Sequence, residues 1–212
     1  TPSFSGEEDK TGDAIEAFLQ GFGVETHRQY NNIYAFNKHF DERKPTLLLN
    51  SHHDTVKPNS AYTKDPFDAH IEDGKLYGLG SNDAGGCLVS LLATFVHFYE
   101  KEGLSHNIIM AATGEEEDAG EKSIRALLPI LPDIDVAIVG EPTLMDLAIA
   151  EKGLVVFDGV VEGTPSHAAH PNDNNCIYNA IETLQWFRDY SFEKVSEALG
   201  EVKLTVTQIN AG

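Results

Sequence analysis

Three apolar runs in this sequence end abruptly in side chains that can bind metals or move protons. Residues 47–54 (LLLNSHHD) end in two histidines and an aspartate, residues 108–117 (IIMAATGEEE) end in three glutamates, and residues 135–143 (DVAIVGEPT) carry Glu141 near their end. Each run is typical of a buried strand. Because ligands of open α/β sheets bind outside the carboxyl ends of the strands, we expect these strand ends to form one polar site.

A cluster of acids at one sheet edge favours a metal site. Two carboxylates about 4 Å apart repel each other by roughly 4 kcal/mol at an effective dielectric near 20, so several such pairs need a cation between them. Mixed imidazole and carboxylate ligands suit zinc, cobalt or manganese. The number of carboxylates favours two ions, and because residues two apart on a strand share a face, we expect His52 to bind metal and Asp54 to orient it.

Each feature has a simpler explanation when it stands alone. His52 and Asp54 also fit a hydrogen-bonded strand end, the three glutamates a solvated turn, and Glu141 a turn residue before proline. Asp83 also fits the N-cap of the helix that follows it. The metal interpretation depends on four separate segments supplying compatible ligands. A calcium site is a weaker alternative, because the spacing fits no EF-hand loop and imidazole is a poor ligand for a hard cation.

The remaining pattern predicts alternating strands and helices, with a change in composition after Lys152. Ser5 and Glu8 have the spacing of a capping box before a helix that ends near Gly21. A strong apolar stripe predicts a second helix from about residue 88 to 99, and a hairpin is expected around Asp73-Gly74. The other predicted strands are 31–37, 47–51, 108–113, 135–140, 146–150, 153–163 and 202–210, and the other predicted helices are 121–131, 176–192 and 193–199.

Composition excludes several classes of function. The chain has 212 residues, and 34 acidic against 15 basic side chains give a formal charge of −19. Nucleic-acid-binding proteins need basic patches, so we expect no nucleic-acid partner. No apolar run reaches the roughly 18 residues that span a bilayer, so no membrane partner is expected either. Cys87 and Cys176 provide no disulfide framework, and we expect a cytoplasmic protein.

Five ordered motifs give the sequence a resemblance to one family. SHHDTV, PFDAHIEDGKLYGLGSNDAGG, TGEEEDAG, VGEPT and GTPSHAAHP resemble successive motifs of the aminoacylase and acetylornithine deacetylase family of di-zinc hydrolases. That family also includes succinyl-diaminopimelate desuccinylase and some carboxypeptidases. The resemblance implies an α/β fold, with a zinc-peptidase-like sheet carrying helices on both faces over residues 1–151. It further implies a partial α+β, ferredoxin-like lid and dimerisation domain over residues 152–212.

The resemblance also implies a set of metal ligands. His52 resembles the terminal ligand of one zinc, and Asp83 resembles the carboxylate that bridges both metals. Glu117 resembles a ligand of the second zinc, and Glu141 the other ligand of the first. The cofactors expected on this basis are two Zn²⁺ ions, with Co²⁺ or Mn²⁺ as substitutes. One departure is the sequence Asp83-Ala84-Gly85-Gly86, where many members have lysine before the glycine.

Catalytic roles follow from the same resemblance. Asp54 resembles the residue that orients the first zinc ligand, and Glu116 resembles the general base that activates water between the metals. His167, in the SHAAHP motif, resembles the lid histidine that reaches the site of a neighbouring subunit and steadies the oxyanion. We therefore expect a homodimer formed through the lid domain.

The expected reaction is removal of an acyl group from a small-molecule N-acyl amino acid. The overall character of the motifs looks most like acetylornithine deacetylase, which implies N-acetylornithine or N-succinylornithine as substrate and a place in arginine biosynthesis. Succinyl-diaminopimelate desuccinylase and a metallo-carboxypeptidase or dipeptidase are the alternatives.

A second hypothesis belongs to another class. The family's last zinc-binding histidine has no counterpart up to Gly212, so we expect a fragment of a longer protein. Such a fragment could be inactive and retain only a dimerisation surface.

Overall fold

Residues 1–211 are described by a computed structural model of the chain. The chain separates into two units, Thr1–Met145 and Asp146–Gly212. The division falls a few residues before the change in composition after Lys152. The functions that the sequence assigns to the two domains stay predictions.

A five-stranded mixed sheet forms the centre of the first unit, with the strand order β1-β2-β6-β3-β7. β1 and β2 pair antiparallel, as do β2 and β6, whereas β3 lies parallel between β6 and β7. The strands expected at 31–37, 47–51, 108–113 and 135–140 are therefore present as β2, β3, β6 and β7, and the α/β fold class is confirmed. The strand bounds are His27–Gln29 (β1), Asn32–Phe36 (β2), Thr46–His52 (β3), Asn107–Thr113 (β6) and Val136–Val139 (β7).

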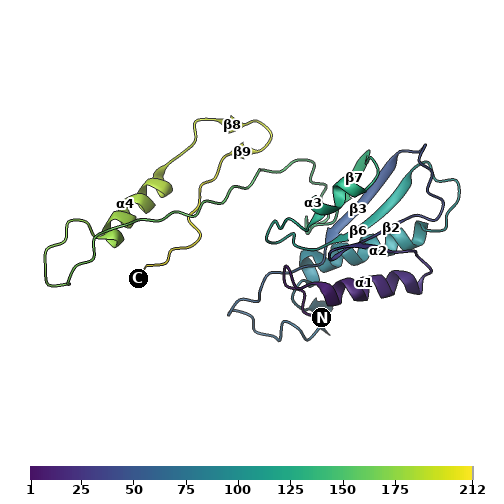
Figure 1. The fold of residues 1–212 in the computed structure, drawn as a ribbon, viewed down its shortest axis with the longest axis horizontal. Coiled ribbons are helices and arrows are strands. Elements are labelled where there is room, and N and C mark those ends of the chain that lie inside the picture. Colours follow the sequence, from purple (N-terminus) through teal and green to yellow (C-terminus); the bar gives the residue numbers. More distant parts are fainter. Residues whose placement is uncertain (212) are drawn as a thin grey trace. The chain divides into compact units, whose positions relative to one another are not determined.

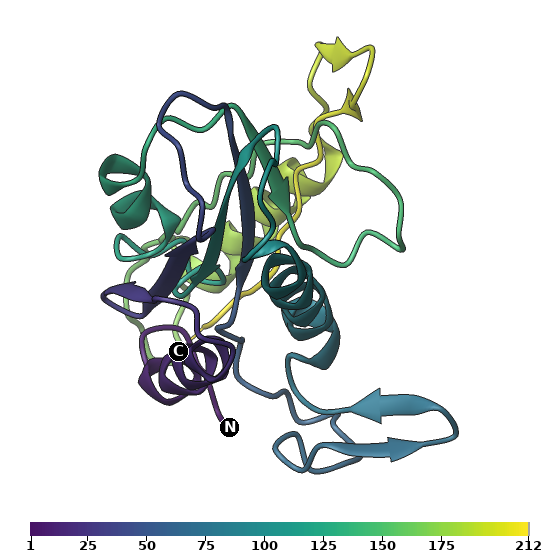
Figure 2. The same ribbon diagram turned by 90° about the vertical axis from the view of Figure 1, so that its right-hand side faces the viewer.

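Helices cover both faces of this sheet (Figures 1 and 2). α1 (Asp9–Gly21) and α2 (Cys87–Phe98) pack on one face, where Leu19, Leu92 and Phe95 join the apolar side chains of the strands. The short helix α3 (Ile124–Leu127) and the turn η2 (Leu128–Ile130) belong to the opposite face, where Leu127 packs with Leu48 and Ile109. Burial of each such side chain contributes about 1.5–3 kcal/mol, so the two clusters hold the sheet rigid.

The segment between β3 and α2 projects from the sheet as a hairpin, seen in blue in Figure 2. Its strands are β4 (His70–Glu72) and β5 (Lys75–Tyr77). Asp73 and Gly74 between them have φ values of 51° and 74°, as a tight hairpin turn requires, which confirms the predicted turn. The chain then passes through η1 (Ser81–Gly86), an irregular helical turn that leads into α2.

Two local predictions in the first unit were wrong. Ser5 and Glu8 do not form a capping box, because the Ser5 hydroxyl donates to Asp54 and the Glu8 side chain accepts from Gly6 N and Glu115 N. The predicted helix 121–131 shrinks to α3 and η2. The backbone of Ser123 is extended, with ψ of −157°, so the helix begins only after this residue. Ser123 then caps the helix by accepting from Arg125 N.

Strand β7 is an edge of the sheet and carries exposed apolar side chains. Its single neighbour in the described part of the chain is β3. Val136, Ile138 and Val139 are exposed by 52%, 49% and 57%. The predicted strand is thus present, but it pairs with a strand on one side only, and its apolar side chains are exposed.

The second unit contains one helix and a small ribbon. α4 (Cys176–Asp189) corresponds to the predicted helix 176–192. Asn175 caps its N-terminus, because the Asn175 side chain accepts from Ile177 N. β8 (Val195–Ser196) and β9 (Gly200–Glu201) pair where a helix over 193–199 was expected. The structure assigns no strand to the predicted ranges 146–150, 153–163 and 202–210, and an extended segment becomes a strand only beside a hydrogen-bonded neighbouring strand. Within residues 1–211, no helix is long and apolar enough to cross a membrane.

Candidate metal centre

The carboxyl ends of the three parallel strands β6, β3 and β7 lie side by side at one end of the sheet. His52 is level with Thr113 of β6, and Asn50 is level with Val139 of β7. The loop that follows β6 and the residues that follow β7 therefore lie beside the end of β3. This is the arrangement that the strand pattern predicts, and it brings His52, Glu116, Glu117 and Glu141 to one place.

His52 is the buried centre of the site, with 1% of its surface exposed. Its Nδ1 lies 3.0 Å from the backbone carbonyl of Asp54 and 3.4 Å from Asp54 Oδ1. A proton on Nδ1 donated to Asp54 leaves the lone pair of Nε2 directed at the site. Asp54 is thus placed to orient the imidazole, as second partners of metal-binding histidines do.

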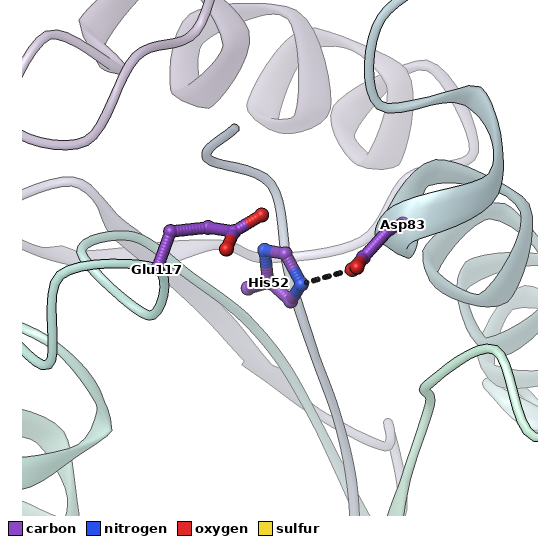
Figure 3. Close-up of side chains that lie close together, drawn as sticks. All are labelled: His52, Asp83 and Glu117. Atoms are coloured by element: carbon purple, nitrogen blue, oxygen red, sulfur yellow. Dashed lines mark hydrogen bonds and ion pairs between the residues drawn. The ribbon is translucent and has the colours of Figure 1, made fainter. Parts of the chain in front are cut away.

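Three side chains from different segments offer ligand atoms to one point. His52 from the end of β3, Asp83 from η1 and Glu117 from the loop after β6 place these atoms within 4.8 Å of one another (Figure 3). His52 Nε2 and Asp83 Oδ1 are 3.0 Å apart. The set of one imidazole and two carboxylates fits a borderline divalent cation such as Zn²⁺, Co²⁺ or Mn²⁺.

Two further carboxylates face the same imidazole. Glu141 Oε1 lies 3.7 Å and Glu116 Oε2 lies 3.9 Å from His52 Nε2. Burial lowers the pKa of His52, but hydrogen bonds and charge interactions with Asp54 and Glu141 outweigh it and raise the pKa to about 11. In the protein without metal, a protonated His52 therefore supplies the positive charge that this acidic cluster requires.

The two glutamates of the loop are electrostatically destabilised as anions. Burial is the main cause that raises the pKa of Glu116, and the charges of Glu141 and Glu117 add to it, while His52 opposes it. Burial also raises the pKa of Glu117, followed by the charge of Asp83. A raised pKa brings a carboxylate closer to the working range of a general base.

Asp54 also holds the glutamate loop. Its Oδ1 accepts from Glu116 N and its Oδ2 from Glu117 N, both at 3.1 Å, and Ser5 donates to Oδ2 at 2.7 Å. Burial raises the pKa of Asp54, but these hydrogen bonds and the one with His52 prevail and lower it to about 2. Asp54 therefore remains ionised and links the histidine to the loop.

The neighbouring His53 is directed elsewhere, as strand alternation predicts. Its Nε2 lies 2.9 Å from the carbonyl of Asn31 and its Nδ1 lies 3.0 Å from the hydroxyl of Thr11. Burial lowers the pKa of His53. His53 is therefore a buried structural histidine that ties β3 to the N-terminal segment.

Sequence reasoning missed Ser51 and Gly140, which fix the backbone just before Glu141. The hydroxyl of Ser51 donates to the carbonyl of Gly140 at 2.7 Å, and Gly140 N donates to the carbonyl of Asn50 at 2.7 Å. A Cβ on Gly140 would lie 2.9 Å from Leu91 Cδ1. The available signal was the polar pair Asn50 and Ser51 inside an otherwise apolar buried strand.

His167, the remaining predicted site residue, belongs to the second unit. Its side chain is exposed, and its Nδ1 accepts from Ala169 N at 3.2 Å. Its ring lies 5.3 Å from that of His170. A role for His167 in the reaction stays a prediction.

A cavity of about 350 Å³ opens beside the ligands, which is large enough for a small molecule. Asp83 and Glu117 form part of its wall, and the rest comes from η1 and the segment around the hairpin. Tyr62, Leu76 and Tyr77 give it an apolar side. Two of the candidate metal ligands, Asp83 and Glu117, thus line this cavity.

Residues 48–208 match the family described as Peptidase family M20/M25/M40. The chain belongs to this family. Two curated relatives are "Succinyl-diaminopimelate desuccinylase" of Rickettsia felis (strain ATCC VR-1525 / URRWXCal2), 29% identical over 205 residues that cover 90% of this chain and 53% of that protein, and "Succinyl-diaminopimelate desuccinylase 2" of Ruegeria sp. (strain TM1040), 29% identical over 184 residues that cover 81% and 47%. The chain spans about half the length of the curated relatives it matches.

Two solved structures share the fold of this chain. The M20 family metallo-carboxypeptidase Sso-CP2 from Sulfolobus solfataricus has a TM-score of 0.55 and 26% identity, over 66% of this chain and 34% of that one. The di-peptidase Dug1p from Saccharomyces cerevisiae has a TM-score of 0.52 and 18% identity, over 66% and 36%, and shows the fold alone. The expectation of a metallohydrolase family is confirmed at the level of the family. The relatives carry the name of the alternative substrate rather than that of acetylornithine deacetylase.

Proposed function

We propose that this chain carries the metal ligands and the general base of an enzyme that hydrolyses the amide bond of an N-acyl amino acid. The observation that carries the proposal is the meeting of His52, Asp83 and Glu117 around one point, with the Glu116 carboxylate close by. Ligands alone would make a structural metal site. A neighbouring carboxylate with a raised pKa adds a group that can accept a proton.

The proposed cofactors are two divalent ions, Zn²⁺ first and Co²⁺ or Mn²⁺ as substitutes. His52 and Glu141 would hold one ion, Glu117 the other, and Asp83 both. When bound, such ions polarise the amide carbonyl and lower the pKa of water. Donor types support this choice, since imidazole and carboxylate suit these ions and no cysteine lies in the cluster.

The side chains divide the remaining work. Asp54 fixes the ring of His52 and the backbone of the glutamate loop. Glu116 takes the proton of the attacking water and returns it to the leaving amine, as a general base and then a general acid. His167 is proposed to donate a hydrogen bond to the oxyanion.

The relatives favour a succinylated diamino acid as the substrate. Proteins of two genera that match this chain at 29% identity carry the name succinyl-diaminopimelate desuccinylase. We therefore place N-succinyl-diaminopimelate ahead of N-acetylornithine and N-succinylornithine, which the motifs alone suggested. Steady-state rates on these three compounds and on a dipeptide decide between them. Hydrolysis of an ornithine derivative with none of the succinyl-diaminopimelate would reverse the order.

The decisive test of the reaction is the substitution Glu116→Gln. Glutamine keeps the size of the side chain but cannot accept the proton, so we expect zinc binding to persist and turnover to fall at least about 100-fold. Glu115→Gln is the matched control, because the Glu115 carboxylate accepts from Lys122 N, and an amide oxygen can still do so. Near-normal turnover of Glu116→Gln would rule out its role as base.

Association through the second unit is the other candidate function. α4 has no buried residue, and Ile177, Ile181 and Trp186 along it are exposed by 51%, 47% and 55%. Ile177 and Ile181 lie one turn apart on one face of the helix, and Trp186 lies on the opposite face. Exposed apolar side chains on both faces favour a partner, here a second copy of the chain. Sedimentation of the chain and of Trp186→Glu tests this. A chain that stays monomeric at all concentrations would count against association. Zinc binding by the same sample would show that the chain is more than an association module.

A further inference from the structure

Glu8 is a fully buried carboxylate with a role that lies outside the chemistry described above. It has no exposed surface and stands just before α1, more than 100 residues from the glutamate loop in sequence. Burying a charged group is costly unless hydrogen bonds satisfy it. Glu8 Oε1 accepts from Gly6 N at 2.6 Å and from Glu115 N at 3.0 Å, and Oε2 accepts from Asn31 Nδ2 at 2.9 Å. All three partners are donors, so the pocket requires a group that only accepts.

The contact with Glu115 N completes a pattern begun by Asp54. Three consecutive backbone N–H groups end on two buried carboxylates: that of Glu115 on Glu8, and those of Glu116 and Glu117 on Asp54. Glu115 has φ of 54°, in the left-handed region that non-glycine residues rarely adopt. The two carboxylates hold the loop in this uncommon conformation.

The approach of Glu8 to the loop is close. A Cβ added to Gly114 would lie 3.2 Å from both Cδ and Oε1 of Glu8, so no larger residue fits without displacement. Gly114 N donates in turn to Asn32 Oδ1 at 3.1 Å. The Glu115 side chain is engaged by Lys122 N, away from the candidate ligands. The loop is therefore anchored at its start, and the next two glutamates extend from that anchor into the site.

We propose that Glu8 is a positioning residue for Glu116 and Glu117. It touches neither the candidate ligand atoms nor the space for substrate, and it acts through the backbone of Glu115. Replacing one carboxylate oxygen by an NH2 group sets a donor against either Asn31 Nδ2 or the N–H groups of Gly6 and Glu115. We expect these groups to separate and the loop to shift with them. The inference rests on the proposed function, because it concerns the same metal site.

Zinc affinity of the full chain, measured by competition with a chelator, tests the inference without relying on turnover. We expect Glu8→Gln to weaken zinc binding by about tenfold, the lower end of the loss seen when outer partners of metal ligands are removed. Glu7→Gln, one residue earlier on an exposed side chain, is the matched control and should bind as the unsubstituted chain does. The melting temperature of each metal-free variant, measured in parallel, reports any general loss of stability.

A second substitution separates positioning from general stability. Asn31 Oδ1 accepts from Arg28 Nη2 at 3.1 Å, and Asn31 Nδ2 donates to Glu8. Combining Glu8→Gln with Asn31→Asp reverses the direction of the Glu8–Asn31 hydrogen bond and keeps the acceptor for Arg28. We expect the pair to recover most of the lost zinc affinity, whereas Asn31→Asp alone places two carboxylates together and weakens binding.

The outcomes are distinct. Unchanged zinc affinity in Glu8→Gln, or a folded pair of substitutions that binds no better than Glu8→Gln alone, would overturn the positioning role. A lower melting temperature with unchanged affinity would show that Glu8 is structural only. Failure of the unsubstituted chain to bind zinc would instead overturn the proposed function, and this inference with it.

Discussion

The backbone N–H of Glu117 donates to Asp54 Oδ2 at 3.1 Å. The same aspartate lies against Nδ1 of His52. One buried side chain therefore couples the position of the candidate histidine ligand to that of a candidate glutamate ligand that follows it by more than 60 residues. Sequence reasoning predicted the contact of Asp54 with His52 but not its contact with Glu117 N.

The buried Asp54 should make the metal-free chain sensitive to acid. Its pKa is about 2 in the folded chain against 3.8 ordinarily, so the ionised form favours folding. This stabilisation is complete above about pH 4 and disappears as the pH falls towards 2, and a shift of this size corresponds to about 2 kcal/mol. Urea unfolding of the metal-free chain at several pH values measures it. Asp54→Asn should be less stable at pH 7 and change less between pH 4 and 2, and parallel curves for the two proteins would contradict this.

Loss of the imidazole should abolish tight zinc binding. His52 supplies the one nitrogen ligand in the cluster formed with Asp83 and Glu117. We expect His52→Ala to lower zinc affinity by at least about 100-fold, because carboxylates alone suit harder cations. Isothermal titration with zinc measures the change. His106→Ala is the control, since His106 is exposed and its ring contacts Ser105. Equal affinity of His52→Ala and the unsubstituted chain would refute the site.

The close packing of Gly140 predicts a joint loss of stability and metal binding. A methyl group there would lie 2.9 Å from Leu91 Cδ1, 3.1 Å from Cys87 Cβ and 3.3 Å from Ser51 Cβ. We expect Gly140→Ala to cost about 1–3 kcal/mol of unfolding free energy and to displace the adjacent Glu141. Gly21→Ala, where no atom lies within 4 Å, is the control. Denaturant unfolding and zinc titration should both change in the first variant and neither in the second.

Phe95 tests the core that supports the site. It is fully buried on α2 against the sheet. Phe95→Ala should lower the free energy of unfolding by about 3–5 kcal/mol, because it removes a large apolar side chain and leaves a cavity. Phe22→Ala, at a position that is 56% exposed, should cost far less. Similar losses in both variants, measured by urea unfolding, would contradict the described core.

The sequence predicted the parts of the molecule that local pattern controls. Apolar runs identified β3, β6 and β7, and their parallel pairing placed His52, Glu117 and Glu141 at one edge. Adjacent residues on a strand point to opposite faces, so the prediction that His53 points away from the side chain of His52 was correct. Asp83, which lies in η1, was assigned to the site by the family resemblance rather than by the strand pattern. The strand-based inferences held because each depends on a few neighbouring residues and on a general property of parallel sheets.

What the sequence could not predict depends on long-range hydrogen bonds. The spacing of Ser5 and Glu8 fits a capping box, yet both side chains bind partners at Asp54 and Glu115. The helix expected from residue 121 begins only after Ser123, whose backbone is extended and whose side chain accepts from Arg125 N. Residues 153–163 alternate like a strand, but alternation describes only a face that can pack, and a strand also requires a partner. The partners of Ser5 and Glu8 lie far away in sequence, where a local pattern cannot predict them.

The exposed side chains of β7 have a practical consequence for every measurement on this chain. An edge strand with open N–H and C=O groups and valine and isoleucine side chains can pair with the same strand of another molecule. Self-association of this kind grows with concentration, so it would distort unfolding curves and could be mistaken for a specific dimer. Each titration should therefore be repeated at several protein concentrations and with the variant Ile138→Lys. Agreement among these measurements would show that the measured behaviour is that of the monomer.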